Sequence, residues 1–596
     1  MKQFFKTLLA STLGLFFGFF LLFIFGAAMI ASLAGDEDKG FEPEENSILR
    51  VTLNQQVVDN ASNGILDKLD IPGMEGDKKI GLNDIIESFE RAKTDDHIKG
   101  VYLDLSSTPG GLGTVEEIRN AILDFKESGK WVMAYSEYYS HYTYYIATAA
   151  DEIFLYPEGE MDFKGLRTEL MFFKGALEKM EVVPQIIRGS NNKFKSAMEP
   201  FMYDKMSDAN REQIMKYLNS MWGHMLTGIS ESRDISVDQL NLLADSMKIQ
   251  STADAIAYKL IDKAMYKDEI LAELRSKLDI DADDDIETAN LEDYMDVEDP
   301  DQKLKEALGK DTGDKVAIVY ATGSIEGGNG DNETIGSERI SRAIRKARLD
   351  STIKAVVLRV NSPGGSALAS DVMWREMILC KEKKPVVVSM GDVAASGGYY
   401  IACPADKIFA NPTTITGSIG VFGLMPYAGD FFENKLGITT DRAMTNDHAD
   451  MGSPFRMLSD YEFNTIQKGV DKIYDQFTSK VAEGRGMTQA EVDDIGQGRV
   501  WTGIDAKEVG LVDELGGLSA AIAYAAETAE LDDYDVTTFP KKKDPFDEIM
   551  KEITGEGKAY FAKQLLGSNY KYYEQLNNVS TLEGFQMRLP YLIDVK

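Results

Sequence analysis

The 596-residue sequence is poor in the side chains that most often bind metals or act as general bases. Its two cysteines, Cys380 and Cys403, are too few for a disulfide framework or a zinc cluster, and their apolar surroundings indicate small core residues. Its four histidines lie in no recognisable triad context, which disfavours a Ser-His-Asp site. Nucleotide-binding and metal-binding motifs are missing too, so we expect neither a cofactor nor a metal.

Positive charge is also scarce. The chain has 64 lysines and arginines against 98 aspartates and glutamates, a formal net charge of −34. Nucleic-acid binding depends on a basic face that neutralises phosphates, so we expect no nucleic-acid partner. The hydrophobic fraction of 43% is typical of a globular chain rather than a disordered one, and the length allows several domains.

One long uncharged stretch lies at the N-terminus. Lys2 and Lys6 precede residues 7–35, which are rich in Leu, Phe, Ile and Ala, and acids follow at 36–38. A spanning helix needs about 20 apolar residues, whereas the core of a cleaved signal peptide has about 7–15. We therefore expect residues 1–35 to form a cytoplasmic start and an uncleaved transmembrane anchor, with cleavage near "ASLAG" as the alternative. The preceding positive charges place the N-terminus in the cytoplasm and the rest of the chain across the membrane.

The sequence contains a long internal repeat. Two pairs of segments match: 95–111 with 350–365, and 144–165 with 399–420. The second pair, which begins "YYIATAADEIF" and "YYIACPADKIF", is offset by 255 residues (399 minus 144). A period of about 250 residues is far too long for a solenoid and indicates two homologous domains, each able to bury its own core.

The repeat sets the predicted domain boundaries. Residues 46–278 form the N-terminal repeat domain, and residues 313–545 form the C-terminal repeat domain. Between them, residues 279–312 are acidic and weakly periodic, which indicates a solvated linker rather than a metal site. Residues 546–596 form a tail with no counterpart in the repeat, and the sequence assigns it no role.

Within each copy, short apolar runs alternate with helical patterns. Ala355–Val360 and Val386–Ser389 have the continuous, β-branched character of buried strands. Residues 337–350 repeat apolar side chains at helical spacing, including Ile340 and Ile344. This alternation predicts an α/β fold with a largely parallel sheet in each domain, and sites in such sheets form at the carboxyl ends of strands.

Two glycine-rich motifs fall at such strand ends. "NSPGG" follows one predicted strand, and "AASGG" follows the next, about 30 residues later. Acyl transfer needs an activated nucleophile and donors for the developing oxyanion. Ser396 is the candidate nucleophile, and the backbone N–H groups of Gly364, Gly365 and Gly397 are candidate oxyanion donors. Either motif alone would fit a tight turn without a ligand, but the pair favours a site.

The repeat also bears on the general base. Because no histidine lies in a context that suits a general base, lysine is the remaining candidate, provided that burial lowers its pKa. His141 occupies the first-copy position equivalent to Ser396, and alignment of the two "PF" dipeptides sets Lys195 opposite Ala449. Each copy lacks the group that the other keeps, which predicts one composite site across the domain interface. Lys193, two residues from Lys195, is a rival base.

Four motifs carry a family resemblance: "NSPGGS", "MGDVAASGGYYIA", "NPTTITGSIGVFG" and "KFKSAMEPF". From the anchor to about residue 540, the sequence resembles the long, duplicated form of the signal peptide peptidase A, or protease IV, family. The resemblance implies that Ser396 is the nucleophile, Lys195 the general base and Ser418 a group that assists the lysine. Only this resemblance selects Lys195 over Lys193.

The resemblance implies further properties. The fold would be that of the Clp protease proteolytic subunit and the crotonases, with repeated ββα units in two tandem domains after a transmembrane helix. Members are oligomers, tetrameric in the long form, of the bacterial inner (cytoplasmic) membrane, with the catalytic domains on the periplasmic side. Their substrates are released signal peptides and other apolar peptides, and they use no cofactor.

The sequence therefore predicts a membrane-anchored serine endopeptidase that works through a Ser/Lys dyad and an acyl-enzyme. A crotonase-like acyl-CoA enzyme is one alternative, because it would share the fold and an oxyanion hole. A catalytically inert scaffold that binds peptides is another. The division of Ser396 and Lys195 between the copies disfavours the first alternative, and the presence of both residues disfavours the second.

Overall fold

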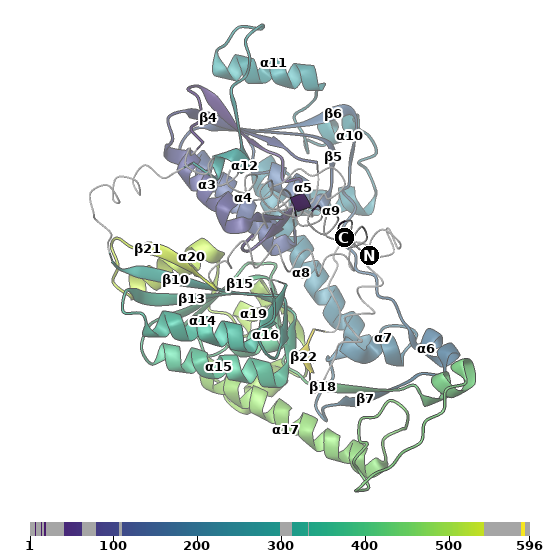
Figure 1. Cartoon of the computed structure of the whole chain (residues 1–596). Helices are drawn as coiled ribbons and strands as arrows, with labels where there is room; N and C mark the ends of the chain where they lie inside the picture. Colours follow the sequence, from purple (N-terminus) through teal and green to yellow (C-terminus); the bar gives the residue numbers. More distant parts are fainter. Residues whose placement is uncertain are drawn as a thin grey trace.

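The computed structural model describes residues 41–61, 79–106, 110–297, 313–331, 333–540 and 586–589, together with residues 6, 14, 17 and 18. Among these residues, no helix has the length and apolar character needed to span a bilayer. The predicted anchor, 1–35, lies outside the described residues except at those four isolated positions. The described chain forms two α/β units, one above the other in Figure 1.

The first unit is built on a six-stranded parallel sheet. In spatial order its strands are β9 (Thr288–Asn290), β1 (Ser47–Val51), β4 (Ile98–Asp104), β5 (Trp131–Tyr139), β6 (Glu152–Met161) and β8 (Lys263–Ala264). Its helices are α3 (Leu82–Thr94), α4 (Leu112–Lys126), α5 (His141–Ala147), α9 (Val237–Asp245), α10 (Thr252–Ala257) and α11 (Lys267–Leu278). Helices α3, α4 and α5 pack on one face of the sheet, and α11 packs on the other.

The second unit repeats this arrangement. In the same spatial order its parallel strands are β21 (Asp535–Phe539), β10 (Lys315–Thr322), β13 (Ile353–Ser362), β15 (Val386–Ala395), β16 (Lys407–Ala410) and β20 (Glu514–Leu515). Its helices are α14 (Ser337–Leu349), α15 (Ala367–Lys381), α16 (Gly397–Ala402), α17 (Asp460–Arg485), α18 (Gln489–Ile495), α19 (Gly503–Glu508) and α20 (Leu518–Thr528). The equivalent strand orders confirm a duplicated α/β fold.

The buried strands follow from their sequences. The two apolar runs predicted as strands, Ala355–Val360 and Val386–Ser389, lie in the central strands β13 and β15. Their apolar side chains are buried on both faces of the sheet, as expected for a parallel sheet covered by helices. Strand β15 is longer than the run Val386–Ser389 and continues to Ala395, directly before Ser396. Its second half pairs with β17 (Ile415–Gly417), which in turn pairs with β19 (Val500–Thr502).

The acidic segment 279–312 is not simply a linker. Its residues 288–290 form β9, the edge strand of the first sheet, and α12 (Leu291–Tyr294) follows directly. Ala289, Leu291 and Tyr294 are buried among the acids and join the core of the first unit. The prediction was wrong here because one buried apolar residue in the strand and two in the helix after it are enough to join this acidic segment to the core. Residues 298–312 lie outside the described part of the chain.

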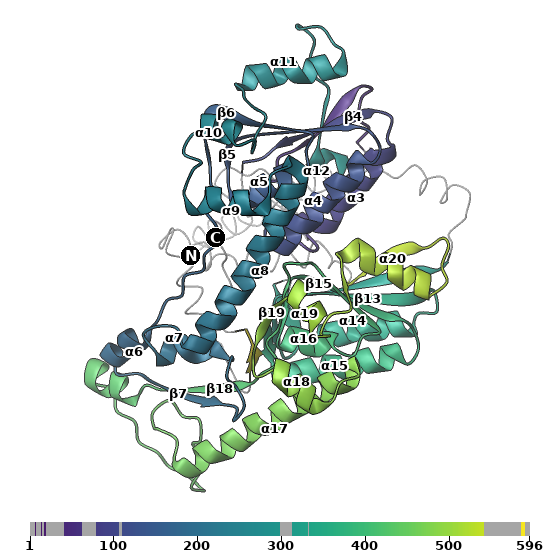
Figure 2. The ribbon, with the colours of Figure 1, turned by 180° about the vertical axis from the view of Figure 1, so that it is seen from behind.

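One segment of the first unit, residues 174–233, reaches into the second unit, and we call it the excursion. Strand β7 (Val183–Arg188) pairs antiparallel with β18 (Phe422–Tyr427) of the second unit along its whole length. The excursion also contains α6 (Lys174–Met180), η1 (Ser196–Met198) and α7 (Glu199–Met202), and it returns through α8 (Asp208–Arg233). Figures 1 and 2 show α8 running between the units, with α6 and α7 beside elements of the second. The residues around Lys195 belong to the first unit by sequence, but they pack against the second unit.

A third sheet joins the excursion to the second unit. Its strands are β12 (Thr334–Gly336), β11 (Ser324–Glu326), β14 (Gly364–Ser366), β22 (Gln586–Arg588), β18 and β7, in that order. The first unit has a two-stranded counterpart of β11 and β12, formed by β2 (Gln56–Val58) and β3 (Lys79–Gly81). A short helix, η2 (Phe431–Lys435), follows β18. Strand β22 belongs to the C-terminal tail, so part of that tail enters the fold.

A buried ionic cluster holds the two units together. The Arg359 guanidinium on β13 donates from Nε to Asp59 Oδ1 and from Nη2 to Glu117 Oε1, each at 2.7 Å, and from Nη1 to Ser389 Oγ at 2.8 Å. The charged side chains are at most 3% exposed. Both carboxylates come from the first unit, so this cluster exists only when the units are docked.

Gly111 and Thr114 of the first copy lie in the same interface. Thr114 donates its N–H at 2.9 Å and its hydroxyl at 2.8 Å to the carboxylate of Asp392, which lies on β15. A Cβ at Gly111 would lie 2.5 Å from Asp392 Cγ, so the absence of a side chain allows this close approach. Gly111, the first-copy equivalent of Gly365, therefore packs against the strand that leads to Ser396.

We predict that Arg359→Met destabilises the docked chain by about 3–5 kcal/mol, because it leaves two buried carboxylates without a counter-charge. Chemical unfolding of the full chain measures the effect. Lys354→Met is the matched control, since Lys354 lies on the same strand but its ion pair with Asp314 is exposed, and such pairs contribute about 1 kcal/mol or less. Equal losses for both variants would contradict a stabilising role of the cluster.

Candidate active site

Ser396 lies at a strained turn between β15 and α16. Its φ of 55° and ψ of −112° lie outside the regions that L-residues prefer. The turn is fixed on both sides: the Ser396 N–H donates to Gly417 O at 2.8 Å, and its carbonyl accepts the N–H of Tyr400 at 2.9 Å. A sharp strand-to-helix turn of this kind aims a serine hydroxyl away from the backbone.

The structure brings the three predicted side chains together. Lys195 Nζ lies 2.9 Å from Ser396 Oγ, 3.0 Å from Ser418 Oγ and 3.0 Å from Ser418 O. The lysine is 1% exposed, and both serines are fully buried. The amine comes from the first unit and the hydroxyls from the second, so the site is composite.

Burial determines the charge of this lysine. Desolvation lowers the pKa of Lys195 well below its ordinary value, and no carboxylate among the described residues offsets that shift. The amine's hydrogen-bond partners are neutral hydroxyl and carbonyl groups. A neutral amine has a free lone pair, so it is chemically able to accept a proton from Ser396.

Ser418 has a restricted geometry of its own. Its φ is 51°, and its N–H donates to Arg499 O at 2.6 Å. This turn presents both the hydroxyl and the carbonyl of Ser418 to the lysine amine. Ser418 therefore orients the amine through two contacts without adding a charge.

Backbone and side-chain contacts hold the lysine loop from both units. The N–H of Phe194 donates to Gln497 O at 2.9 Å. Gln213 Nε2, from α8, donates to Phe194 O at 3.1 Å and to Ser196 Oγ at 2.9 Å. Arg188 Nη2 donates to Lys195 O at 3.2 Å. Both neighbours of Lys195 are thus fixed, which limits the positions open to the amine.

Some residues that shape the site were not predicted. A Cβ at Gly498, whose φ is 82°, would lie 2.4 Å from Lys195 Cβ, so this position requires glycine. Glu199 accepts hydrogen bonds from Ser207 and Asn210 and holds the start of α8 beside the lysine loop. The only sequence features that could have pointed to Glu199 and Gly498 were the glutamate of "KFKSAMEPF" and the glycines of "GQGRV".

The other candidate residues lie elsewhere. Lys193 is exposed, and its amine lies 4.7 Å from the centre of the Phe194 ring rather than at the serine. His141 is a buried residue of the first unit: burial lowers its pKa, and its Nε2 accepts the N–H of Lys164 at 3.2 Å. Ala449, the position aligned with Lys195, is exposed. Geometry thus distinguishes the two lysines, which the residues alone could not.

The three candidate oxyanion donors are not equivalent. The N–H of Gly364 donates to Ser362 Oγ at 3.2 Å, so it is already used within the chain. A Cβ at Gly397 would lie 3.1 Å from the nitrogen of Gly365, so these two backbones approach closely beside Ser396. Gly365 and Gly397 are therefore the better pair.

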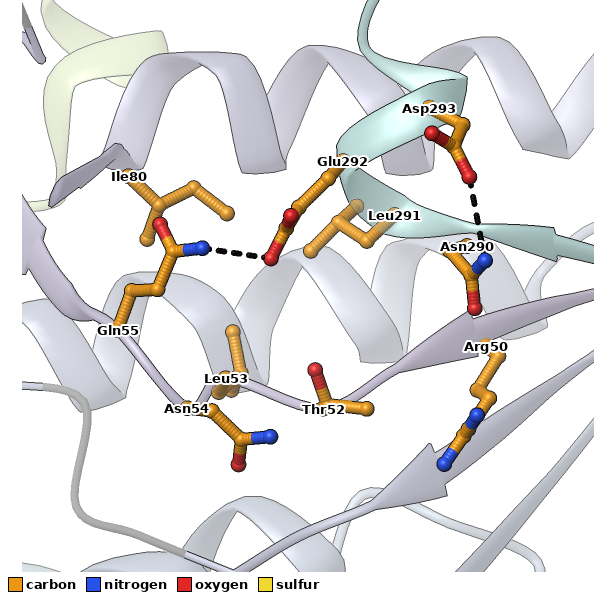
Figure 3. A pocket seen from close by; sticks show the side chains of 10 residues that line it. All are labelled: Arg50, Thr52, Leu53, Asn54, Gln55, Ile80, Asn290, Leu291, Glu292 and Asp293. Atoms are coloured by element: carbon orange, nitrogen blue, oxygen red, sulfur yellow. Dashed lines mark hydrogen bonds between the residues drawn. The ribbon is translucent and has the colours of Figure 1, made fainter. Parts of the chain in front are cut away.

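A pocket of about 290 Å³ lies in the first unit, away from these residues. Figure 3 shows its polar lining, in which Gln55 Nε2 donates to Glu292 Oε1 at 2.7 Å and Asn290 Nδ2 donates to Asp293 Oδ2 at 3.1 Å. Neither a serine nor a cysteine lines it. Across the described residues, no group of three or more His, Cys, Asp or Glu side chains is arranged to hold a metal.

Comparison with known proteins agrees with the duplicated architecture. The model of "Peptidase family S49" matches residues 124–281 and 379–532, one region in each unit. The solved structure of a ClpP1 mutant from Listeria monocytogenes aligns at 17% identity over 37% of this chain and 99% of its own, with a TM-score of 0.24, too low to establish a shared fold. The predicted likeness to Clp protease and the crotonases thus stays a prediction.

Sequence relatives extend over most of the chain. "Protease 4" of Haemophilus influenzae is 35% identical over 86% of this chain and 83% of its own length. "Protease 4" of Salmonella typhi is 36% identical over 80% and 77%, and "Serine protease SPPA, chloroplastic" of Arabidopsis thaliana is 32% identical over 91% and 78%. With both halves of the chain matched in this way, the protein is a serine protease that belongs to peptidase family S49.

Proposed function

We propose that this protease is an endopeptidase in which Ser396 is the nucleophile and Lys195 the general base. The observation that carries the proposal is the 2.9 Å contact between Lys195 Nζ and Ser396 Oγ in a fully buried site. A lysine with a depressed pKa and a serine within hydrogen-bond distance are the two parts that dyad chemistry requires.

The reaction follows from these positions. Ser396 Oγ attacks the scissile carbonyl carbon while the neutral amine of Lys195 takes the hydroxyl proton. The tetrahedral oxyanion accepts the N–H groups of Gly365 and Gly397, and its collapse breaks the peptide C–N bond as Lys195 returns the proton to the leaving amine. Water then hydrolyses the ester, again with Lys195 as base. Ser418 keeps the amine oriented in both halves of the reaction.

The substrate class and the setting are part of the proposal. Released signal peptides and other apolar peptides are the substrates that the family resemblance favours. The uncharged stretch 7–35, preceded by Lys2 and Lys6, supports a single anchor in a bacterial inner membrane with the units on the periplasmic side. A homotetramer is the assembly that the resemblance favours.

We predict that Ser396→Ala and Lys195→Ala each lower cleavage of an apolar peptide by at least about 10³-fold, because either change removes the dyad. Lys193→Ala is the matched control and retains most activity, since that amine is exposed and away from the serine. Steady-state hydrolysis measures the activity of each variant, and circular dichroism checks that each variant is folded. Near-normal rates for folded Lys195→Ala would exclude this lysine as the base.

We also predict that Lys195→Met is inactive but more stable than the wild type. Folding depresses the pKa of Lys195, so between the folded-state and unfolded-state pKa values the unfolded chain binds more protons, and wild-type stability rises with pH. The stability of Lys195→Met lacks this dependence on pH. Its free energy of unfolding therefore exceeds that of the wild type most near neutral pH, and the difference shrinks towards about pH 10.4, the pKa of free lysine.

Thermal unfolding of both proteins from pH 6 to pH 10 tests this linkage. Over the same pH range, the acylation rate of the wild type is expected to rise with pH along a single ionisation. No second inflection is expected near the usual histidine pKa of about 6.5. A Lys195→Met variant that is less stable than the wild type at neutral pH, with no dependence on pH, would show that the amine is not buried neutral.

The membrane topology gives a separate prediction. If residues 1–35 are an anchor with a cytoplasmic start, added protease digests the chain in cells whose outer membrane has been opened and spares a cytoplasmic control protein. Digestion that requires disruption of the inner membrane would place the two units on the cytoplasmic side and contradict the proposed orientation.

A further inference from the structure

Helix α8 of the first unit lies along β19 of the second unit (Figure 2). Arg499 Nη2 donates to Glu212 Oε1 at 2.6 Å, and the hydroxyls of Ser220 and Thr502 lie 2.8 Å apart. These two contacts are about two helical turns apart, so one face of α8 follows the strand. Apolar side chains of the same helix, such as Met221, belong to the core of the first unit. Both units therefore hold α8 in place.

Gln213 lies where α8 meets the lysine loop. Its side chain is 1% exposed. Its Nε2 donates to Phe194 O at 3.1 Å, to Ser196 Oγ at 2.9 Å and to Asn210 Oδ1 at 3.1 Å. Its Oε1 accepts the N–H of Val500 at 3.3 Å. The donor end of this buried amide thus holds the two residues that flank the proposed base, and its acceptor end holds the second unit.

The acceptor end leads to the two serines. Val500 lies opposite Gly417 in the pairing of β19 with β17. The carbonyl of Gly417 accepts the N–H of Ser396 at 2.8 Å. Ser418 follows Gly417 directly and presents its hydroxyl and its carbonyl to the lysine amine. A single amide, that of Gln213, therefore joins the backbone beside the amine to the backbone that holds both hydroxyls.

The duplicated chain supplies an internal comparison. Helices α8 and α17 each have 26 residues and begin after a serine cap, Ser207 in α8 and Ser459 in α17. In this register Gln213 corresponds to Thr465, which is exposed and donates its hydroxyl to Tyr461 O within its own helix at 2.8 Å. The buried amide therefore occurs in the copy that carries the lysine, and the copy without the lysine has an exposed hydroxyl instead.

We infer that Gln213 is a positioning residue that fixes the Lys195 amine relative to Ser396 and keeps water away from it. The inference rests on the proposed function, because Gln213 acts through the proposed base. Its hydrogen bonds go to the neighbours of Lys195 and to Val500, so it takes no part in bond making or proton transfer.

The chemistry of buried polar groups gives the consequence of losing this amide. Its removal takes an acceptor from the Val500 N–H and a donor from Phe194 O in a site that excludes water. Such groups regain partners when the backbone shifts or when water enters. A shift lengthens the contact between Lys195 and Ser396. Water beside the amine weakens the desolvation that depresses its pKa, so more of the amine is protonated at neutral pH.

Gln213→Met tests the positioning role, because methionine has a similar length but no N–H to donate. We expect kcat for an apolar peptide to fall by about 10- to 100-fold at pH 7, since a small misplacement of a catalytic group has an effect of this size. KM is expected to stay within about twofold, because the lost interaction acts on the reaction step rather than on substrate binding. Gln239→Met is the matched control, since Gln239 is exposed on α9, and it is expected to behave as the wild type.

The pH profile of kcat separates positioning from a merely structural role. We expect the ionisation that controls acylation to move to higher pH in Gln213→Met, so the ratio of wild-type to variant kcat shrinks between pH 7 and pH 10. A structural role alone would lower the unfolding temperature and leave that ionisation where it is in the wild type. The same fold-loss at every pH, or a rise in KM with kcat unchanged, would overturn the inference.

Gln213→Glu is a second variant, which keeps the test decisive if Gln213→Met does not fold. Glutamate retains an acceptor for the Val500 N–H, and its negative charge favours the protonated form of the nearby amine. We expect its controlling ionisation to lie at higher pH than that of the wild type. A wild-type pH profile for folded Gln213→Glu would contradict the inference.

Parallel assays of Ser396→Ala and Lys195→Ala distinguish failure of this inference from failure of the proposed function. Wild-type kcat and pH profile in Gln213→Met, with both alanine variants inactive, would reject the positioning role and leave the dyad in place. Activity that persists in either alanine variant would reject the dyad, and the role of Gln213 with it. Inactive alanine variants together with a shifted profile in Gln213→Met are the expected result.

Discussion

The structure depends on keeping one lysine amine out of water with no opposite charge beside it. Lys195 reaches its two serine partners only because the excursion through β7, η1 and α7 enters the second unit, and its burial between the docked units lowers its pKa. The buried Arg359 cluster and the Thr114–Asp392 contact serve the same end, since they hold the units at the separation that closes the site. These charged groups lie in the interface, whereas the hydrogen-bond partners of the Lys195 amine are neutral.

Duplication explains how such an arrangement is built. In one copy the serine turn is strained and ends a central strand, while the equivalent turn of the other copy starts with a relaxed Ser140 cap followed by His141. Gly365, whose backbone lies close to Gly397 in the second unit, has a first-unit counterpart, Gly111, that packs against Asp392. Under the proposed mechanism, the first unit supplies the base, and the second unit supplies the nucleophile and the oxyanion donors.

The structure brings together three side chains that the sequence singled out: Ser396 from its motif at a strand end, and Lys195 and Ser418 from the family resemblance. The paired strand orders were also predictable from the 255-residue offset. Gly498 and Gln213 were not, since their roles depend on where the excursion meets the second unit, and no local pattern encodes such a contact. Strand β9 was misassigned because the acidic composition of its surroundings outweighed its single apolar residue, Ala289, and β22 is too short to show a period.

The separation of the two reacting groups along the chain has a consequence for biosynthesis. Lys195 precedes Ser396 by 201 residues, and the carbonyl that fixes its loop, at Gln497, comes later still. Chains grow from the N-terminus and fold domain by domain as they emerge. Under the proposed mechanism, a nascent chain holds its base long before its nucleophile, so we expect no hydrolytic activity until most of the second unit has been translated.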